Sequence, residues 1–100
     1  MAEFEHNGEK IPTAPSKDPD SVVDYGSDYS QFLRDGEVIS VSEWLVPAPL
    51  VNEGESFTDT TTTILLSGGV VNEKYLVTNR ITTSLGIKVD RSMNIPCREN

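Results

Sequence analysis

The sequence has few of the residues that metalloproteins and many enzymes use at their sites. Among its 100 residues there is one cysteine, Cys97, and one histidine, His6. A lone cysteine cannot form an intramolecular disulfide, and a zinc site built from cysteine and histidine is excluded. Ser67 and Ser92 have no histidine placed to activate them. We therefore expect no metal, no cofactor and no enzymatic activity.

Long apolar runs and basic residues are also scarce. No run approaches the roughly 18 apolar residues of a membrane helix. The residues from Met1 to Glu5 are acidic, without the apolar region of a secretory signal. Eight Lys and Arg oppose 16 Asp and Glu, for a net charge of −8. Because nucleic acid requires a basic surface, neither a membrane nor nucleic acid is expected as a partner.

The charge is distributed unevenly along the chain. Residues 1–59 contain 13 acids and 3 bases, whereas residues 60–100 contain 3 acids and 5 bases. Electrostatic complementarity between neighbouring copies sets register and specificity. The asymmetry is thus compatible with a subunit whose basic part docks on the acidic part of another copy.

The length corresponds to one domain. Residues 1–17 carry several charges, prolines and a glycine, with Phe4 and Ile11 as the only large apolar side chains. Such a segment buries too little to offset its ordering entropy. We expect a flexible or extended N-terminal arm at 1–17, which alternatively orders on a neighbouring subunit, and a folded domain at 18–100.

Within the domain, short segments rich in β-branched residues alternate with turn signals. Strict alternation is clearest in 75–83 and 87–95, which are joined by a turn at 84–86 and indicate an antiparallel hairpin. Residues 52–55 are assigned to a turn. Further strands are expected at 21–25, 38–46, 50–51 and 56–67, the last divided near Asp59. About seven short strands without a long helix predict an all-β fold, an antiparallel β-sandwich or small barrel.

Several motifs in this framework belong together. They are Trp44-Leu45-Val46-Pro47, Ser67-Gly68-Gly69 and the run from Tyr75 to Thr83, flanked by Asp18–Asp20, Asp35–Ile39 and Asp90–Ser92. With them, about 80 of the 100 residues resemble a family of short structural proteins of tailed bacteriophages. Proteins of this family are described as fibre–tail adaptors or head–tail accessory proteins with an immunoglobulin-like fold.

The resemblance implies a non-enzymatic virion protein with an immunoglobulin-like β-sandwich, assembled in the bacterial cytoplasm. It would act as an adaptor that links the tail tube or nozzle to tail fibres. Its partners would be other tail, fibre or neck proteins and copies of itself in a ring. A capsid decoration or head-completion (neck) protein is the alternative within this class.

Two aromatic residues receive structural assignments. Alternation with Val46 places Trp44 in the core, and an interface anchor is the alternative. Tyr75 begins the penultimate strand. In immunoglobulin-like folds such a tyrosine often bonds back to the preceding loop, and the alternative is a core tyrosine with its hydroxyl at the rim.

Surface charges and the arm supply the expected contact residues. The regularly spaced acids at 18, 20, 24 and 28 lack the loop and closing glutamate of a calcium site, so they are interpreted as a solvated edge. The expected partner contacts are Phe4, Ile11, Asp24, Asp28, Arg80 and Lys88.

A carbohydrate-binding module is the alternative from another class. β-Sandwiches often bind sugars through exposed aromatic side chains. Only Tyr25, Tyr29 and Phe57 are available for such a platform.

Overall fold

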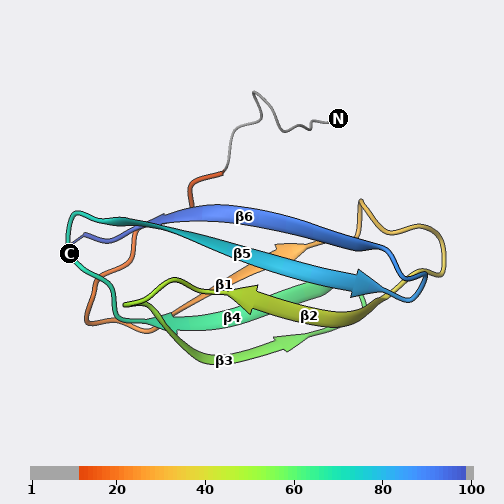
Figure 1. Cartoon of the computed structure of the whole chain (residues 1–100), viewed down its shortest axis with the longest axis horizontal. Coiled ribbons are helices and arrows are strands. Elements are labelled where there is room, and N and C mark those ends of the chain that lie inside the picture. The colour runs from red at the N-terminus through yellow and green to blue at the C-terminus, as the bar shows by residue number, and fades with distance from the viewer. Residues whose placement is uncertain (1–11, 99–100) are drawn as a thin grey trace.

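The computed structural model describes residues 12–98, which form a sandwich of six β-strands (Figure 1). No helix that could cross a membrane occurs among these residues. The strands are β1 (Val23–Asp28), β2 (Ile39–Leu45), β3 (Val51–Phe57), β4 (Thr61–Ser67), β5 (Lys74–Thr83) and β6 (Lys88–Pro96). The all-β prediction is confirmed, with six strands in this part of the chain instead of about seven.

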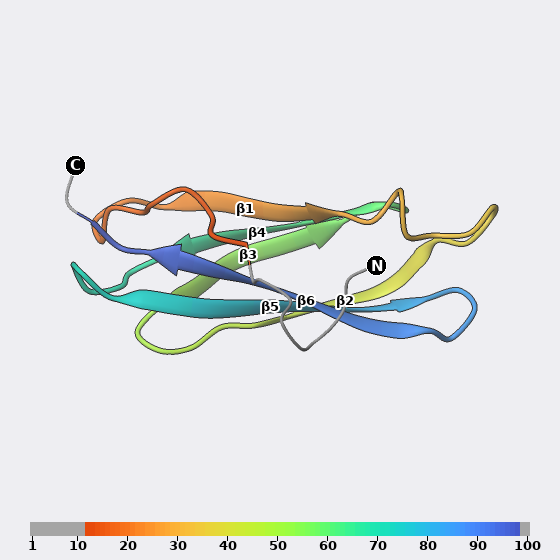
Figure 2. The same cartoon turned by 90° about the horizontal axis from the view of Figure 1, so that it is seen from above.

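The strands form two three-stranded antiparallel sheets, in the orders β1-β4-β3 and β2-β5-β6. Viewed from above, the sheets lie as two layers (Figure 2). The hairpin of β5 and β6 pairs without a register shift from Lys74↔Pro96 to Thr82↔Lys88. The hairpin predicted from alternation is therefore confirmed.

The core lies between the inner faces of the two sheets. On β4, Thr62, Ile64 and Leu66 are buried, while on β5 Val77 and Ile81 are fully buried. These positions alternate with exposed or half-buried neighbours, as period-two strands require. Burial of each large apolar side chain contributes roughly 1.5–3 kcal/mol, so this inner face accounts for much of the fold's stability.

The turn predicted at 52–55 is wrong, because these residues belong to strand β3. All seven residues of β3 are exposed, and the strand pairs only with β4. An edge strand that is open to water on both faces needs no alternation of apolar residues. Its polar sequence therefore resembles a loop, and a register shift between Asn52 and Gly54 obscures the pattern further.

β2 corrects the expected face of the strand at 38–46. Ser42 and Trp44 pair with Ile81 and Asn79 of the buried face of β5, as alternation predicts. A bulge between Ile39 and Val41 then changes the phase. A bulge adds one residue to one strand of the pair. Ile39 is consequently buried, whereas Ser40, which strict alternation with Trp44 predicts on the inner face, is exposed.

Candidate functional site

One side of the sandwich has two open strand edges. β1 is the edge of the first sheet and β6 is the edge of the second, each with one neighbouring strand. On the other side, β3 and β2 are also edge strands, and there β2 contacts both β3 and β4. An unpaired edge presents free backbone N–H and C=O groups and is the usual site for pairing with another chain.

The chain itself covers part of the β6 edge. Thr13 and Lys17 form parallel bridges with Asn94 and Cys97. The Ala14 amide donates to the Asn94 carbonyl at 2.8 Å, and the Asn94 amide donates to the Pro12 carbonyl at 2.9 Å. Residues 12–17 therefore extend the second sheet, but only alongside the C-terminal end of β6.

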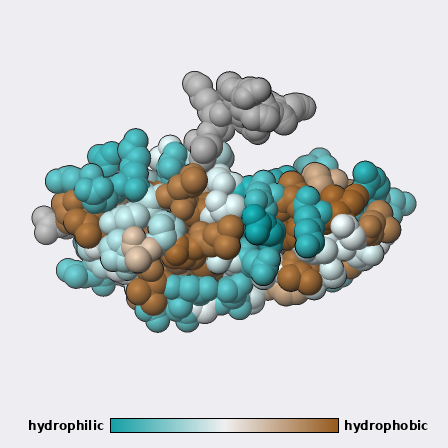
Figure 3. Space-filling model, in the orientation of Figure 1, coloured by the Kyte–Doolittle hydropathy of each residue, from teal (hydrophilic) through white to brown (hydrophobic). Residues whose placement is uncertain are grey.

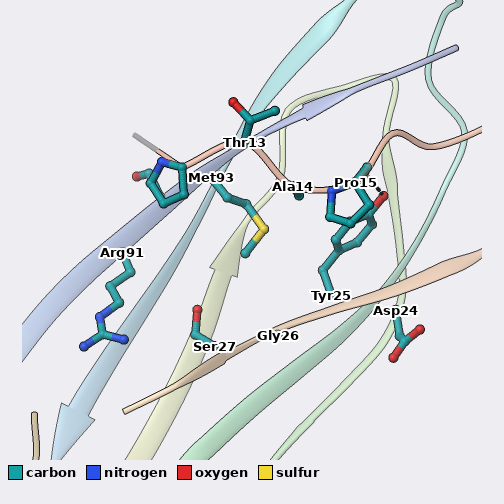
Figure 4. Close-up of a pocket in the computed structure, with 11 residues that line it drawn as sticks. Thr13, Ala14, Pro15, Asp24, Tyr25, Gly26, Ser27, Arg91 and Met93 are labelled. Atoms are coloured by element: carbon teal, nitrogen blue, oxygen red, sulfur yellow. Dashed lines mark hydrogen bonds between the residues drawn. The ribbon is translucent and has the colours of Figure 1, made fainter. Parts of the chain in front are cut away.

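A pocket of about 450 Å³ lies where this cover ends (Figure 4). One wall is the segment from Pro12 to Pro15, and a second is β1 from Asp24 to Ser27. The third consists of Arg91, Ser92 and Met93 of β6. The Tyr25 hydroxyl crosses the opening and donates to the Pro15 carbonyl at 3.3 Å. The pocket thus joins three segments that are distant in the sequence.

Arg91 connects β6 to the end of β1 beside this pocket. Its guanidinium carbon lies 4.2 Å from the centre of the Tyr29 ring, and Nη1 donates to the Asp28 carbonyl at 2.9 Å. A cation over an aromatic face is attracted by the ring quadrupole. This contact explains how a charged residue occupies the apolar face of β6, where alternation gave it no partner.

The base of the N-terminal segment is anchored by a buried lysine. Lys17 is fully buried, and its Nζ donates to the carbonyls of Asp18 and Gly68, both at 2.8 Å. Burial of an ammonium group is costly unless hydrogen bonds compensate it. The two carbonyls provide that compensation and join the segment to the loop between β4 and β5.

The expected charged contacts lie on the open side or on the outer face next to it. Asp24 is exposed on β1 and lines the pocket, and Asp28 is exposed at the end of β1. Arg80 forms a two-pronged pair with Asp90, with distances of 2.8 and 2.9 Å. Lys88 is exposed and forms no ion pair with another residue of 12–98. Phe4 and Ile11 lie outside the described residues.

The electrostatics of this region follow from those contacts. The Arg80 guanidinium bonds to Asp90 and lowers the pKa of that carboxyl group. The amide of Ser30 donates to Asp28 and lowers the pKa of the Asp28 carboxyl group. Both carboxylates are therefore held in the charged form, while Lys88 on the outer β6 surface forms no ion pair within residues 12–98.

Trp44 and Tyr75 lie in the interior and at its rim. Trp44 is 8% exposed and belongs to the larger core cluster. Tyr75 is half-buried, and its hydroxyl accepts a hydrogen bond of 3.0 Å from the Val70 amide in the loop before β5.

The aromatic residues proposed for sugar binding form no exposed platform in the described part of the chain. Tyr25 is 7% exposed and Tyr29 is fully buried, so only Phe57 of the three is exposed. No group of three metal-binding side chains occurs within residues 12–98. On the face seen in Figure 3, apolar and polar residues are interspersed. This arrangement does not favour sugar binding and suits protein contacts instead.

Two features of the structure were not anticipated from the sequence. Met93 of β6 packs against the core and, together with Pro12, also lines the pocket. Asn79 is buried on β5, where it bonds to Tyr29, Thr62 and Ser42. Its position on the apolar face of an alternating strand was the available signal.

None of the curated proteins compared matches the chain. The family model described as "Podophage GP4 fiber-tail adaptor protein gp77" matches residues 17–96. The match includes all six strands and two of the three pocket walls, and the wall from Pro12 to Pro15 lies before it. It favours the tail adaptor over the capsid, neck and carbohydrate-binding alternatives. The chain therefore belongs to the podophage fibre-tail adaptor family and is a structural component of the phage particle.

Proposed function

We propose that this chain joins the tail tube or nozzle to the tail fibres as one copy in a ring, without catalysis and without contact to nucleic acid. Assembly takes place in the host cytoplasm. Membership of the fibre-tail adaptor family supports this function. An adaptor needs separate surfaces for its two partners, and the shape of the domain provides them.

The observation that carries the proposal is that exposed apolar residues occur at both ends of the sandwich, as they also do along its strands. The longest dimension is 42 Å (Figure 1). Leu85 in the β5–β6 turn and Phe32 in the β1–β2 connection lie at one end, with 61% and 39% exposure. Val22 and Val70 lie at the opposite end, with 57% and 51% exposure. Exposed apolar side chains are typical anchors of protein interfaces.

Contacts between copies would use the sides of the domain. Asp24 and Asp28 give the β1 edge a negative charge, and Lys88 gives the β6 surface a positive one. The Arg80 charge is already paired with Asp90, so Lys88 is the stronger candidate for a contact across copies. The arm residues Phe4 and Ile11 complete the set of proposed contacts.

Assembly of particles with variant adaptors tests the proposal. Leu85→Asp changes one end, and Val22→Asp changes the other. One variant should remain on the tail but fail to hold fibres, whereas the other should be lost from the tail. Electron cryo-microscopy of the particles distinguishes the two results. Normal fibre and adaptor density in both variants would contradict the proposal, as would adaptor density on the capsid surface.

A further inference from the structure

The backbone on the open side of β6 has hydrogen-bonding groups without a backbone partner in the described part of the chain, residues 12–98. The N–H and C=O groups of Asn94 bond to residues 12–14 and so point away from β5. β5 and β6 pair without a register shift, so the same groups of Ser92 and Asp90 point in that direction too. They have no backbone partner among residues 12–98. A strand-accepting edge thus begins beyond Asn94.

Pro12 interrupts the ladder that residues 12–17 form along this edge. In a parallel ladder, the carbonyl of Ser92 would accept the amide hydrogen of residue 12, in the same way that Asn94 accepts from Ala14. Proline has no amide hydrogen. The ladder of residues 12–17 on β6 is therefore interrupted at the rim of the pocket, where the Ser92 carbonyl has no backbone donor among residues 12–98.

We propose that this edge, from Lys88 to Ser92, accepts residues 1–11 of a neighbouring copy as an added β-strand. The inference rests on the ring proposed above and identifies its contact. Residues 1–11 contain no proline, so each can donate to a ladder. Fully extended, 11 residues span about 36 Å. That length suffices to cross to a neighbour and still pair with a five-residue edge.

Charge complementarity supports the same occupant. Residues 1–11 carry three glutamates and one lysine. Of the charged side chains in the accepting part of β6, Asp90 is paired with Arg80. Lys88 has no ion pair with residues 12–98, and the guanidinium of Arg91 lies beside the pocket. Electrostatic attraction therefore favours pairing of the acidic segment 1–11 with this part of β6. The pocket beneath receives the side chains that point between the sheets.

The first test uses the full chain and removes one hydrogen-bond donor. Ser92→Pro deletes the outward N–H group, a change that edge strands tolerate, and Ser92→Ala is the matched control. Both lose the hydroxyl contact with Thr78. Sedimentation should show self-association for wild type and Ser92→Ala, and about tenfold weaker association for Ser92→Pro with an unchanged circular dichroism spectrum. If folded Ser92→Pro associates as strongly as wild type, the β6 edge is not the contact, although the proposed ring could still form through other surfaces.

The second test remains decisive if Ser92→Pro unfolds. A synthetic peptide of residues 1–11 is titrated into the isotope-labelled full chain, and a scrambled peptide is the control. The amides of Asp90 and Ser92 should shift, and hydrogen exchange in 88–92 should slow. Lys88→Glu should weaken binding severalfold, and a peptide with lysines replacing its glutamates should restore it. Amide shifts confined to residues outside 88–92 would refute the β6 edge as the binding site. No binding, with a chain that stays monomeric at millimolar concentration, would refute the ring as well.

Discussion

The hydroxyl of Tyr29, just beyond β1, donates to Oδ1 of Asn79 on β5 at 2.9 Å and joins the two sheets through the buried interior. Thr62 donates to the same oxygen at 3.1 Å, while the Asn79 amide group donates to Ser42 and to the Glu43 carbonyl. One side chain therefore satisfies buried groups from both sheets. Buried polar networks stabilise a structure only when every member is satisfied.

Replacement of Asn79 should be strongly destabilising. Asn79→Ala leaves the hydroxyls of Tyr29 and Thr62 without their acceptor, so the free energy of unfolding should fall by roughly 2–4 kcal/mol. Urea unfolding measures this loss. Thr78→Ala, on the opposite face of β5, serves as the control and should cost less than about 1 kcal/mol. Similar losses in both variants would show that the network contributes little.

Tyr29 should also make the fold sensitive to alkali. Burial raises its pKa to about 12, and Arg91 opposes part of the shift. A tyrosine ionises near pH 10 in the unfolded chain, so the stabilising contribution is complete below pH 10. It should be lost as the pH rises from about 10 to about 12.

Two measurements check this pH dependence. Absorbance at alkaline pH should resolve a tyrosine that ionises late and whose signal is absent in Tyr29→Phe. Stability from urea unfolding should decline less steeply above pH 10 in that variant than in wild type. If stability declines with pH equally steeply in both proteins, another group causes the alkaline transition. Tyr25 is the first to examine, because burial also raises its pKa.

Tyr75→Phe should loosen the loop before β5. The variant keeps the ring but loses the bond from the Val70 amide, which should cost about 1 kcal/mol. Faster hydrogen exchange at Val70, with little change in the strands, would locate the effect. An unaltered exchange rate at Val70 would mean that water replaces the hydroxyl without loss.

Trp44 should respond to the size of its replacement. Trp44→Ala leaves a cavity in the core and should cost about 3–5 kcal/mol. Trp44→Phe should cost much less, because it also removes an Nε1 group that is buried without a hydrogen-bond partner within 12–98. Thermal melting of the two variants provides the comparison. Equal melting temperatures for the two variants would show that the size of the side chain at position 44 does not contribute to core stability.

The sequence was sufficient to predict the strands that face the core on one side only. β4 and β5 alternate between buried and more open positions, and β6 alternates over 88–91, a period that is visible in a single sequence. β3 escaped prediction because it is exposed on both faces, so no burial constrains its pattern. The phase of β2 was missed because a bulge inserts a residue that periodicity does not signal.

The open side of the sandwich could be predicted only in part. Arg91 stood out as a charge on an apolar face, but its partners, Tyr29 and the Asp28 carbonyl, are more than sixty residues away in the sequence. The same holds for the pocket, whose walls come from 12–15, 24–27 and 91–93. A pairing of such distant segments depends on sheet order, which local patterns do not determine.

The parallel attachment of residues 12–17 to β6 also has a mechanical consequence. Its hydrogen bonds from Ala14 to Asn94 and from Lys17 to Pro96 lie across the direction of the segment, and buried Lys17 holds its base to the Gly68 carbonyl. A pull along the segment therefore loads these bonds together in shear and does not open them one after another. A tether at the N-terminal end of this domain can bear tension while the sandwich remains folded.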